Sequence, residues 1–197
     1  MRGSPAPRYV CPSAFCNENT MSQFEELEPD EMDRAELSRE RFLASHRAIA
    51  VCAREFGRLA EELADRASVL CSELSIAEPA EMRQTPGRCI VQMGPIAVTT
   101  AWLRGPLDSL ADGRLMAIAW HGTIVRRGFR ERPERNDAPR ATQTAVSVWE
   151  DTYTASAEDE ASWRWKSEVD AARYASTELA ALLMDQARAA FQQRKTA

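Results

Sequence analysis

The sequence has little histidine or lysine, and it lacks the motifs that mark common chemistries. Its 197 residues include 2 histidines, and its lysines are Lys166 and Lys195. No phosphate-binding glycine-rich loop, Gly-x-Ser-x-Gly elbow, His-Glu-x-x-His pair or EF-hand loop occurs. Two imidazoles leave little material for acid–base chemistry near neutral pH. These absences argue against catalysis without deciding the question, and they predict neither a metal nor a cofactor.

Long hydrophobic runs are also lacking, so the sequence predicts no membrane span. Arg2 and Arg8 are not followed by a continuous apolar segment, so no secretory signal is expected. The 5 cysteines are odd in number, lie far apart and form no Cys-x-x-Cys. This spacing does not fit a disulfide framework. Together these features predict a cytoplasmic protein.

The composition is that of a globular chain, with 44% hydrophobic and 28% charged residues and a net charge of −5. This length and apolar fraction are enough for the core of one domain. Arginine supplies nearly all the positive charge and alanine is abundant, which indicates a GC-rich, bacterial-like coding sequence. The acidic balance argues against a nucleic-acid coat or a membrane-surface protein.

Residues 1–28 are rich in proline and then in acidic residues, and they are predicted to form a disordered, acidic lead. A single α+β domain is expected over residues 29–197. Pro29 suits a first helical turn and Pro79 cannot continue a helix, so the first helix is expected over 29–77. That helix would be about 70 Å long, so a bend or a projecting end is expected.

Large apolar residues recur every seven positions along this helix, with small residues between them. This stripe predicts an interface with another helix. Its candidate residues are Phe42, Ile49, Phe56, Leu63 and Leu70.

The periodicity changes to two over residues 88–154, which predicts four strands in an antiparallel meander. A second long helix is expected over 157–194, and it would carry Trp163 and Trp165 pointing in different directions. The fold class is therefore α+β, with two layers: a long N-terminal helix, a four-stranded meander and a long C-terminal helix.

A candidate ligand pocket lies around the histidine of the third strand, next to Gly122, where a ligand could approach the backbone closely. Its residues are His121, Glu150, Trp149 and Tyr153. The alternative, which we favour, is a strand histidine bonded to a neighbour beside a bulge.

The segment 126–140 is rich in arginine, and guanidinium groups bind phosphates and carboxylates. The candidate contacts to an anionic partner are Arg126, Arg127, Arg130, Arg132 and Arg135. Glu131, Glu134 and Asp137 lie among them. A solvated loop whose charges largely cancel is the simpler interpretation, so nucleic acid is not the expected partner.

Apolar residues alternate with other apolar residues in the expected strands, so both faces of the sheet are predicted to be apolar. Two helices that pair with each other would leave one face uncovered, which monomers seldom tolerate. Either a second copy covers that face, or the helices lie on opposite faces, or the loop 104–113 folds over it. We expect a non-catalytic protein-interaction module, adaptor-like or chaperone-like, that self-associates or binds a protein partner. The alternatives are a small-ligand-binding or enzymatic domain with a pocket near His121, and nucleic-acid binding through 126–140.

Overall fold

The fold was analysed in a computed structural model, which describes residues 29–103, 110–124 and 145–196. The expected lead, residues 1–28, and the arginine-rich segment 126–140 lie outside these residues. The helices are α1 (Pro29–Leu43), α2 (His46–Glu73) and α3 (Ser176–Thr196). The strands are β1 (Glu81–Thr85), β2 (Arg88–Met93), β3 (Ile96–Leu103), β4 (Arg114–His121), β5 (Val146–Ser156), β6 (Arg164–Ser167) and β7 (Arg173–Tyr174).

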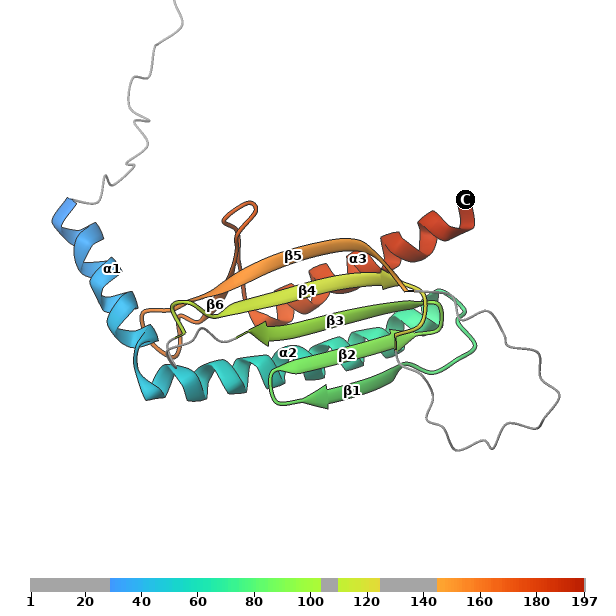
Figure 1. The fold of residues 1–197 in the computed structure, drawn as a ribbon, viewed down its shortest axis with the longest axis horizontal. Coiled ribbons are helices and arrows are strands. Elements are labelled where there is room, and N and C mark those ends of the chain that lie inside the picture. Colours follow the sequence, from blue (N-terminus) through green and yellow to red (C-terminus); the bar gives the residue numbers. More distant parts are fainter. Residues whose placement is uncertain (1–28, 104–109, 125–144, 197) are drawn as a thin grey trace, which may run out of the picture.

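The architecture is a two-layer α+β sandwich, which confirms the two-layer α+β part of the predicted fold class. All seven strands form one antiparallel sheet in the order of the sequence, β1 to β7. Helices α2 and α3 lie side by side on the same face of this sheet, and α1 projects from the start of α2 (Figure 1). The possibility that the two helices cover opposite faces is therefore wrong.

The single helix expected over 29–77 is two helices with a break at Ala44 and Ser45. Ser45 caps α2, because its Oγ accepts a hydrogen bond from the Ala48 backbone N–H at 3.2 Å. The same hydroxyl donates to the Phe42 carbonyl oxygen at 2.6 Å, which closes the end of α1. One serine thus produces the bend that the length of the helical pattern predicted.

The expected four-stranded meander understates the sheet, which has seven strands. The added strand β1 is exposed at every residue except Glu81, so its sequence shows no apolar alternation. Strands β6 and β7 occupy the first half of the helix expected over 157–194, and α3 begins only at Ser176. Both corrections concern short strands at the two edges of the sheet.

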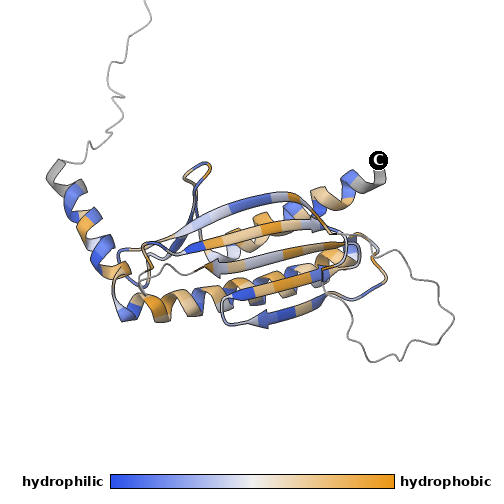
Figure 2. Cartoon of the chain, in the orientation of Figure 1, coloured by the Kyte–Doolittle hydropathy of each residue, from blue (hydrophilic) through white to orange (hydrophobic). Residues whose placement is uncertain are grey.

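The core lies between the sheet and the pair α2 and α3. Phe56, Leu63 and Leu70 of α2 are at most 5% exposed and pack toward strand residues such as Val91 and Val98. Hydrophobic residues concentrate in α2 and in β2 to β4, whereas α1 is largely hydrophilic (Figure 2). Burial of this apolar surface is the main source of the stability of the domain.

A tryptophan cluster anchors α3 to the rest of the core. Trp163 and Trp165 lie two residues apart around a strand, not on a helix, so their rings meet edge to face with centroids 5.5 Å apart. Trp165 Nε1 donates to Ser176 Oγ at 3.1 Å, and Ser176 Oγ donates to Glu55 Oε2 at 2.9 Å. One serine therefore links β6, α3 and α2.

Ion pairs join the two N-terminal helices to the turn that follows β5. Arg39 contacts Glu158 at 3.3 Å, and Glu160 pairs with Arg47 and, at 3.7 Å, with Arg54. The hydrogen bond from Arg47 is the largest of the effects that lower the pKa of Glu160 below its ordinary value of 4.5. These groups are exposed, so each pair contributes little to stability alone.

This junction predicts a pH dependence of stability. Because the pKa of Glu160 is lower in the folded state, its contribution is present at neutral pH and is lost as the pH falls below 4.5. We expect the melting temperature to fall over that range and to fall less steeply in Glu160→Gln, measured by circular dichroism. An identical pH profile for the two proteins would show that the Glu160 pairs contribute nothing.

Candidate interaction surface

The face of the sheet opposite the helices is the leading candidate for a functional surface. Residues directly opposite each other in neighbouring strands point to the same side, and the register sets Ala97 against Trp120, and Ala101 against Met116. We call this side the open sheet face. Its central residues are Ile90, Ala97, Thr99, Ala101, Met116, Ile118 and Trp120.

None of these seven residues belongs to the hydrophobic cluster that α2 and α3 form with the sheet. In the part of the chain that the structure describes, no helix or strand packs on the open sheet face. Ala97, Thr99 and Ile118 at the centre are at most 7% exposed, whereas Ala101, Met116 and Trp120 are half-buried. An antiparallel sheet that faces water normally alternates apolar and polar side chains. A sheet that is apolar on both faces is therefore expected to be covered on the second face by another surface.

Two hydrogen-bonded side chains give the open sheet face a fixed shape. Trp120 Nε1 donates to Thr99 Oγ1 at 3.1 Å, which holds the indole across β3. Gln92 Nε2 donates to the carbonyl oxygens of Gly94, Ile96 and Gly122, and Gln92 Oε1 accepts from the Ile124 backbone N–H. The chain leaving β4 is thereby tied to the β2–β3 turn.

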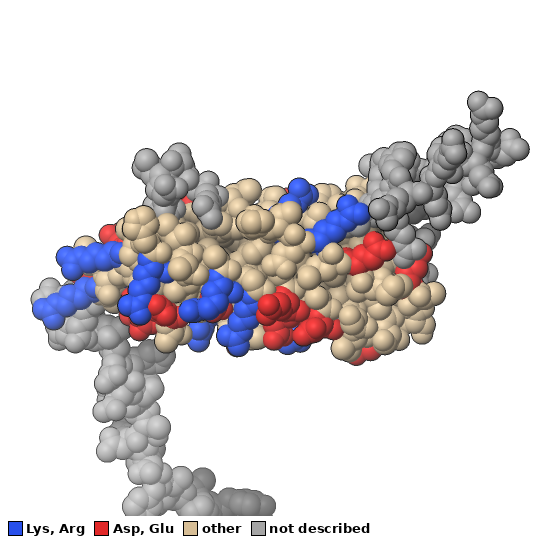
Figure 3. Space-filling model, turned by 90° about the horizontal axis from the view of Figure 1, so that it is seen from below, with Lys and Arg blue, Asp and Glu red and all other residues tan. Residues whose placement is uncertain are grey.

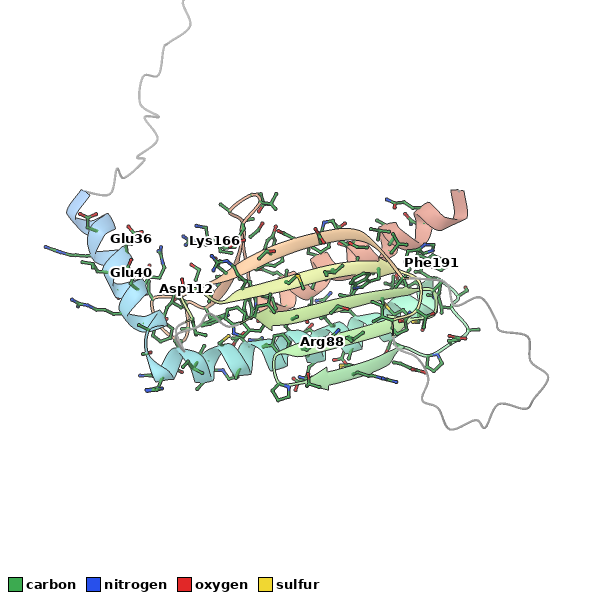
Figure 4. All side chains as sticks on the ribbon, in the orientation of Figure 1. Glu36, Glu40, Arg88, Asp112, Lys166 and Phe191 are labelled. Carbon is green, nitrogen blue, oxygen red and sulfur yellow. The ribbon has the colours of Figure 1, made fainter. Side chains whose placement is uncertain are left out.

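A hollow of about 690 Å³ lies on this face. Trp120, Ile118, Met116 and Ala101 contribute to its floor, and Arg88 is its single charged lining residue among those described. Arg88 lies at the start of β2, at one border of this surface (Figure 4). Glu150 of β5 lies at the other border, directly opposite Ile118. Charged residues thus border this surface on both sides, since Glu81 and Arg83 of β1 lie on the same face beyond β2.

The residues predicted to form a ligand pocket do not lie on one face. Glu150 shares the open sheet face, whereas Tyr153 lies opposite Leu115 and is fully buried on the helix side. Trp149 packs against the core, and His121 is half-buried at the end of β4. None of the four lines the hollow on the open sheet face.

Burial changes the ionisation of Tyr153. Desolvation by burial raises its pKa far above the ordinary value, and the nearby Asp151 carboxylate adds to the effect. Its hydroxyl has no hydrogen-bond partner among the described residues. The phenol therefore stays neutral at physiological pH and packs against Tyr174 with ring centroids 6.1 Å apart.

The candidate helix interface lies mostly within the protein itself. Phe56, Leu63 and Leu70 are buried in the core, and Phe42 and Ile49 are half-buried against it. Phe56, Leu63 and Leu70 therefore pack within their own chain, whereas Phe42 and Ile49 are partly exposed. The sequence alone could not distinguish a core-facing stripe from an intermolecular one, because both have the same period.

The arginines predicted to contact an anionic partner, Arg126, Arg127, Arg130, Arg132 and Arg135, lie outside the described residues. Charged side chains of both signs gather along one margin of the molecule when it is viewed from below (Figure 3). Such a mixture does not produce the single-sign field that steers polyanions to a surface.

Comparisons with family models, curated proteins and solved structures find no match to this chain. Over the described residues, no group of three or more His, Cys, Asp or Glu side chains is placed to hold a metal ion. In that same part of the chain, no helix combines the length and the apolar character that crossing a membrane requires.

Proposed function

We propose that this protein is a non-catalytic protein-interaction module that self-associates through the open sheet face. The observation that carries the proposal is the apolar surface of β2 to β4, on which no described helix or strand packs. Helices α2 and α3 both pack on the other side of the sheet. The dispersal of His121, Glu150 and Tyr153 over different sites favours interaction over catalysis.

The size of the surface suits a second copy of the chain. With about 4.8 Å between strands and about 3.4 Å per residue, β2 to β5 offer about 500 Å². Two copies packed face to face would bury about 1,000 Å², which is near the lower limit for a specific interface. Two sheets packed in this way lie about 10 Å apart with their strands nearly aligned.

The two border charges favour one geometry for that dimer. A twofold axis parallel to the strands places β2 of one copy over β5 of its partner. Arg88 and Glu150 lie on these two strands, offset by two residues along them. Neither side chain has an ion-pair partner within the described part of the chain. The axis would thus create two Arg88–Glu150 pairs, one at each border.

The first test places a charge in the centre of the open sheet face. We expect light scattering after size exclusion to give about twice the chain mass of 22.0 kDa at micromolar concentration. Met116→Glu should weaken self-association by roughly tenfold or more, because a carboxylate would be buried without a partner. Val69→Glu is the matched control, since Val69 is 59% exposed on α2.

A second test uses the border charges and does not disturb the centre of the sheet. Arg88→Glu and Glu150→Arg should each weaken the dimer roughly threefold, and the double swap should restore it. Both residues are exposed, so folding should be unaffected. A wild-type protein that runs as a monomer without a bound partner would refute self-association, and failure of the double swap would exclude this axis.

A further inference from the structure

A second cavity lies on the other side of the sheet, between α2 and the turn that joins β1 to β2. Its volume is about 430 Å³. The helix contributes Ile49, Cys52, Ala53, Phe56 and Gly57; the turn contributes Gln84, Thr85, Pro86 and Gly87; and Trp102 and Leu110 complete the lining. This volume lies within the range of about 300–1,000 Å³ that is typical of small-molecule sites.

The aromatic wall of the cavity is held in a fixed position. The Trp102 ring contacts Trp165 edge to face, with centroids 5.7 Å apart. The Trp102 backbone N–H donates to the Gly87 carbonyl oxygen at 2.7 Å, which ties the turn to the end of β3. A Cβ atom at Gly113 would lie 2.2 Å from a Trp102 ring carbon, so glycine at 113 is required for this ring position.

Gly57 leaves the helical wall open. It lies within α2, has no positive φ, and a Cβ atom placed on it would meet no atom within 4 Å. Glycine is the poorest helix former apart from proline, so its backbone geometry and packing give no reason for its presence here. Its effect is to leave empty the volume that a side chain at position 57 would occupy.

The lining determines the chemical class of a ligand. No described lining residue carries a charge, so an ionised ligand would lose its hydration without compensation. Phe56 and Cys52 are buried at the apolar end, whereas Gln84 and Thr85 are exposed. We propose that this cavity binds a small neutral amphipathic molecule, with its ring or short chain against Trp102 and Phe56 and its uncharged polar end at Gln84 and Thr85.

The proposal does not require self-association, although the cavity and the hollow on the open sheet face share Pro86, Gly87 and Trp102 at the edge of the sheet. Binding can be measured with N-phenyl-1-naphthylamine, a neutral dye whose fluorescence increases in apolar surroundings. We expect saturable binding of one dye per chain. We also expect 1-octanol to displace the dye at roughly tenfold lower concentration than octanoate, because only the alcohol is uncharged at neutral pH.

A pair of substitutions at one position tests the location of the site. Gly57→Leu should fill the cavity and weaken dye binding roughly tenfold or more, whereas the matched control Gly57→Ala should bind within about threefold of wild type. Both variants should melt at or above the wild-type temperature, because both residues favour a helix more than glycine does. Gly57→Leu therefore separates loss of binding from loss of folding.

Two further results would overturn the proposal. Equal dye binding by Gly57→Leu and wild type would place the dye elsewhere, and equal displacement by octanol and octanoate would remove the argument for a neutral ligand. Because an apolar dye can also bind the open sheet face, Met116→Glu serves as a control. Retained binding in Met116→Glu supports the cavity, whereas loss of binding assigns the dye to that face.

Discussion

Replacing Trp165 by alanine is expected to lower the free energy of unfolding by about 3–5 kcal/mol, the range typical of a large aromatic removed from a core. Trp165 is fully buried and is the largest such side chain in the described residues. It contacts Trp102 on one side and Trp163 on the other. Its removal would leave a void between β6, the end of β3 and the start of α3, and these elements could not collapse around it without shifting.

Trp165→Phe is the matched variant for this prediction. It retains most of the ring contacts but loses the hydrogen bond from Nε1 to Ser176 Oγ, so the expected loss is about 1–2 kcal/mol. Urea unfolding followed by far-ultraviolet circular dichroism gives both values, provided that the protein concentration is the same throughout. A loss below about 1 kcal/mol in Trp165→Ala would mean that the cluster does not hold α3 in place.

The same cluster shows where sequence analysis failed and why. Residues 157–194 contain many alanines and a charge distribution suited to a helix, which predicts that the two tryptophans lie on that helix. Trp163 and Trp165 alternate with Arg164, however, and this period of two belongs to a strand. A strand of four residues offers too few positions for that period to be decisive.

The helical period of residues 29–77 was predictable because its signals are local, although the break at Ser45 was not located. The heptad of Phe56, Leu63 and Leu70 predicted an interface with another helix, whereas the structure buries these residues in the core between α2 and the sheet. Strand β1 could not be predicted in this way, because all of its residues except Glu81 are exposed and its pairing depends on the neighbouring β2. An edge strand is defined by its hydrogen bonds rather than by burial.

The open sheet face was foreseeable in part. Alternation of apolar residues on both sides of β3 and β4 indicated that each face of the sheet is apolar. The expected two-layer arrangement, with α2 and α3 paired on one side of the sheet, is confirmed. The cavity beside Gly57 was not predicted, since its walls come from α2, the β1–β2 turn and β3, which are distant in the sequence.

The role of Gln92 cannot be inferred from the alternation of polar and apolar residues in β2. In the sequence it occupies the polar position of β2, where a solvent-facing side chain is the usual interpretation. In the structure it is 6% exposed, and its amide bonds to three carbonyl oxygens and one N–H of two neighbouring turns. Two of these partners, Gly122 and Ile124, lie 30 and 32 residues from Gln92 in the sequence.

Replacing Gln92 by leucine should therefore cost about 3 kcal/mol or more, because the new side chain has similar size but leaves these buried backbone groups without partners. Gln92→Glu is the matched control: its carboxylate can still accept from the Ile124 N–H but cannot donate to the carbonyl oxygens of Gly94, Ile96 and Gly122. Because it also places negative charge beside those oxygens, it should destabilise the protein at neutral pH and do so less once the carboxylate is protonated in acid. Urea unfolding at pH 7 measures both losses, and repeating it at mildly acidic pH tests the charge contribution. A leucine variant as stable as wild type would show that water satisfies these groups equally well and that Gln92 does not hold the end of β4 in place.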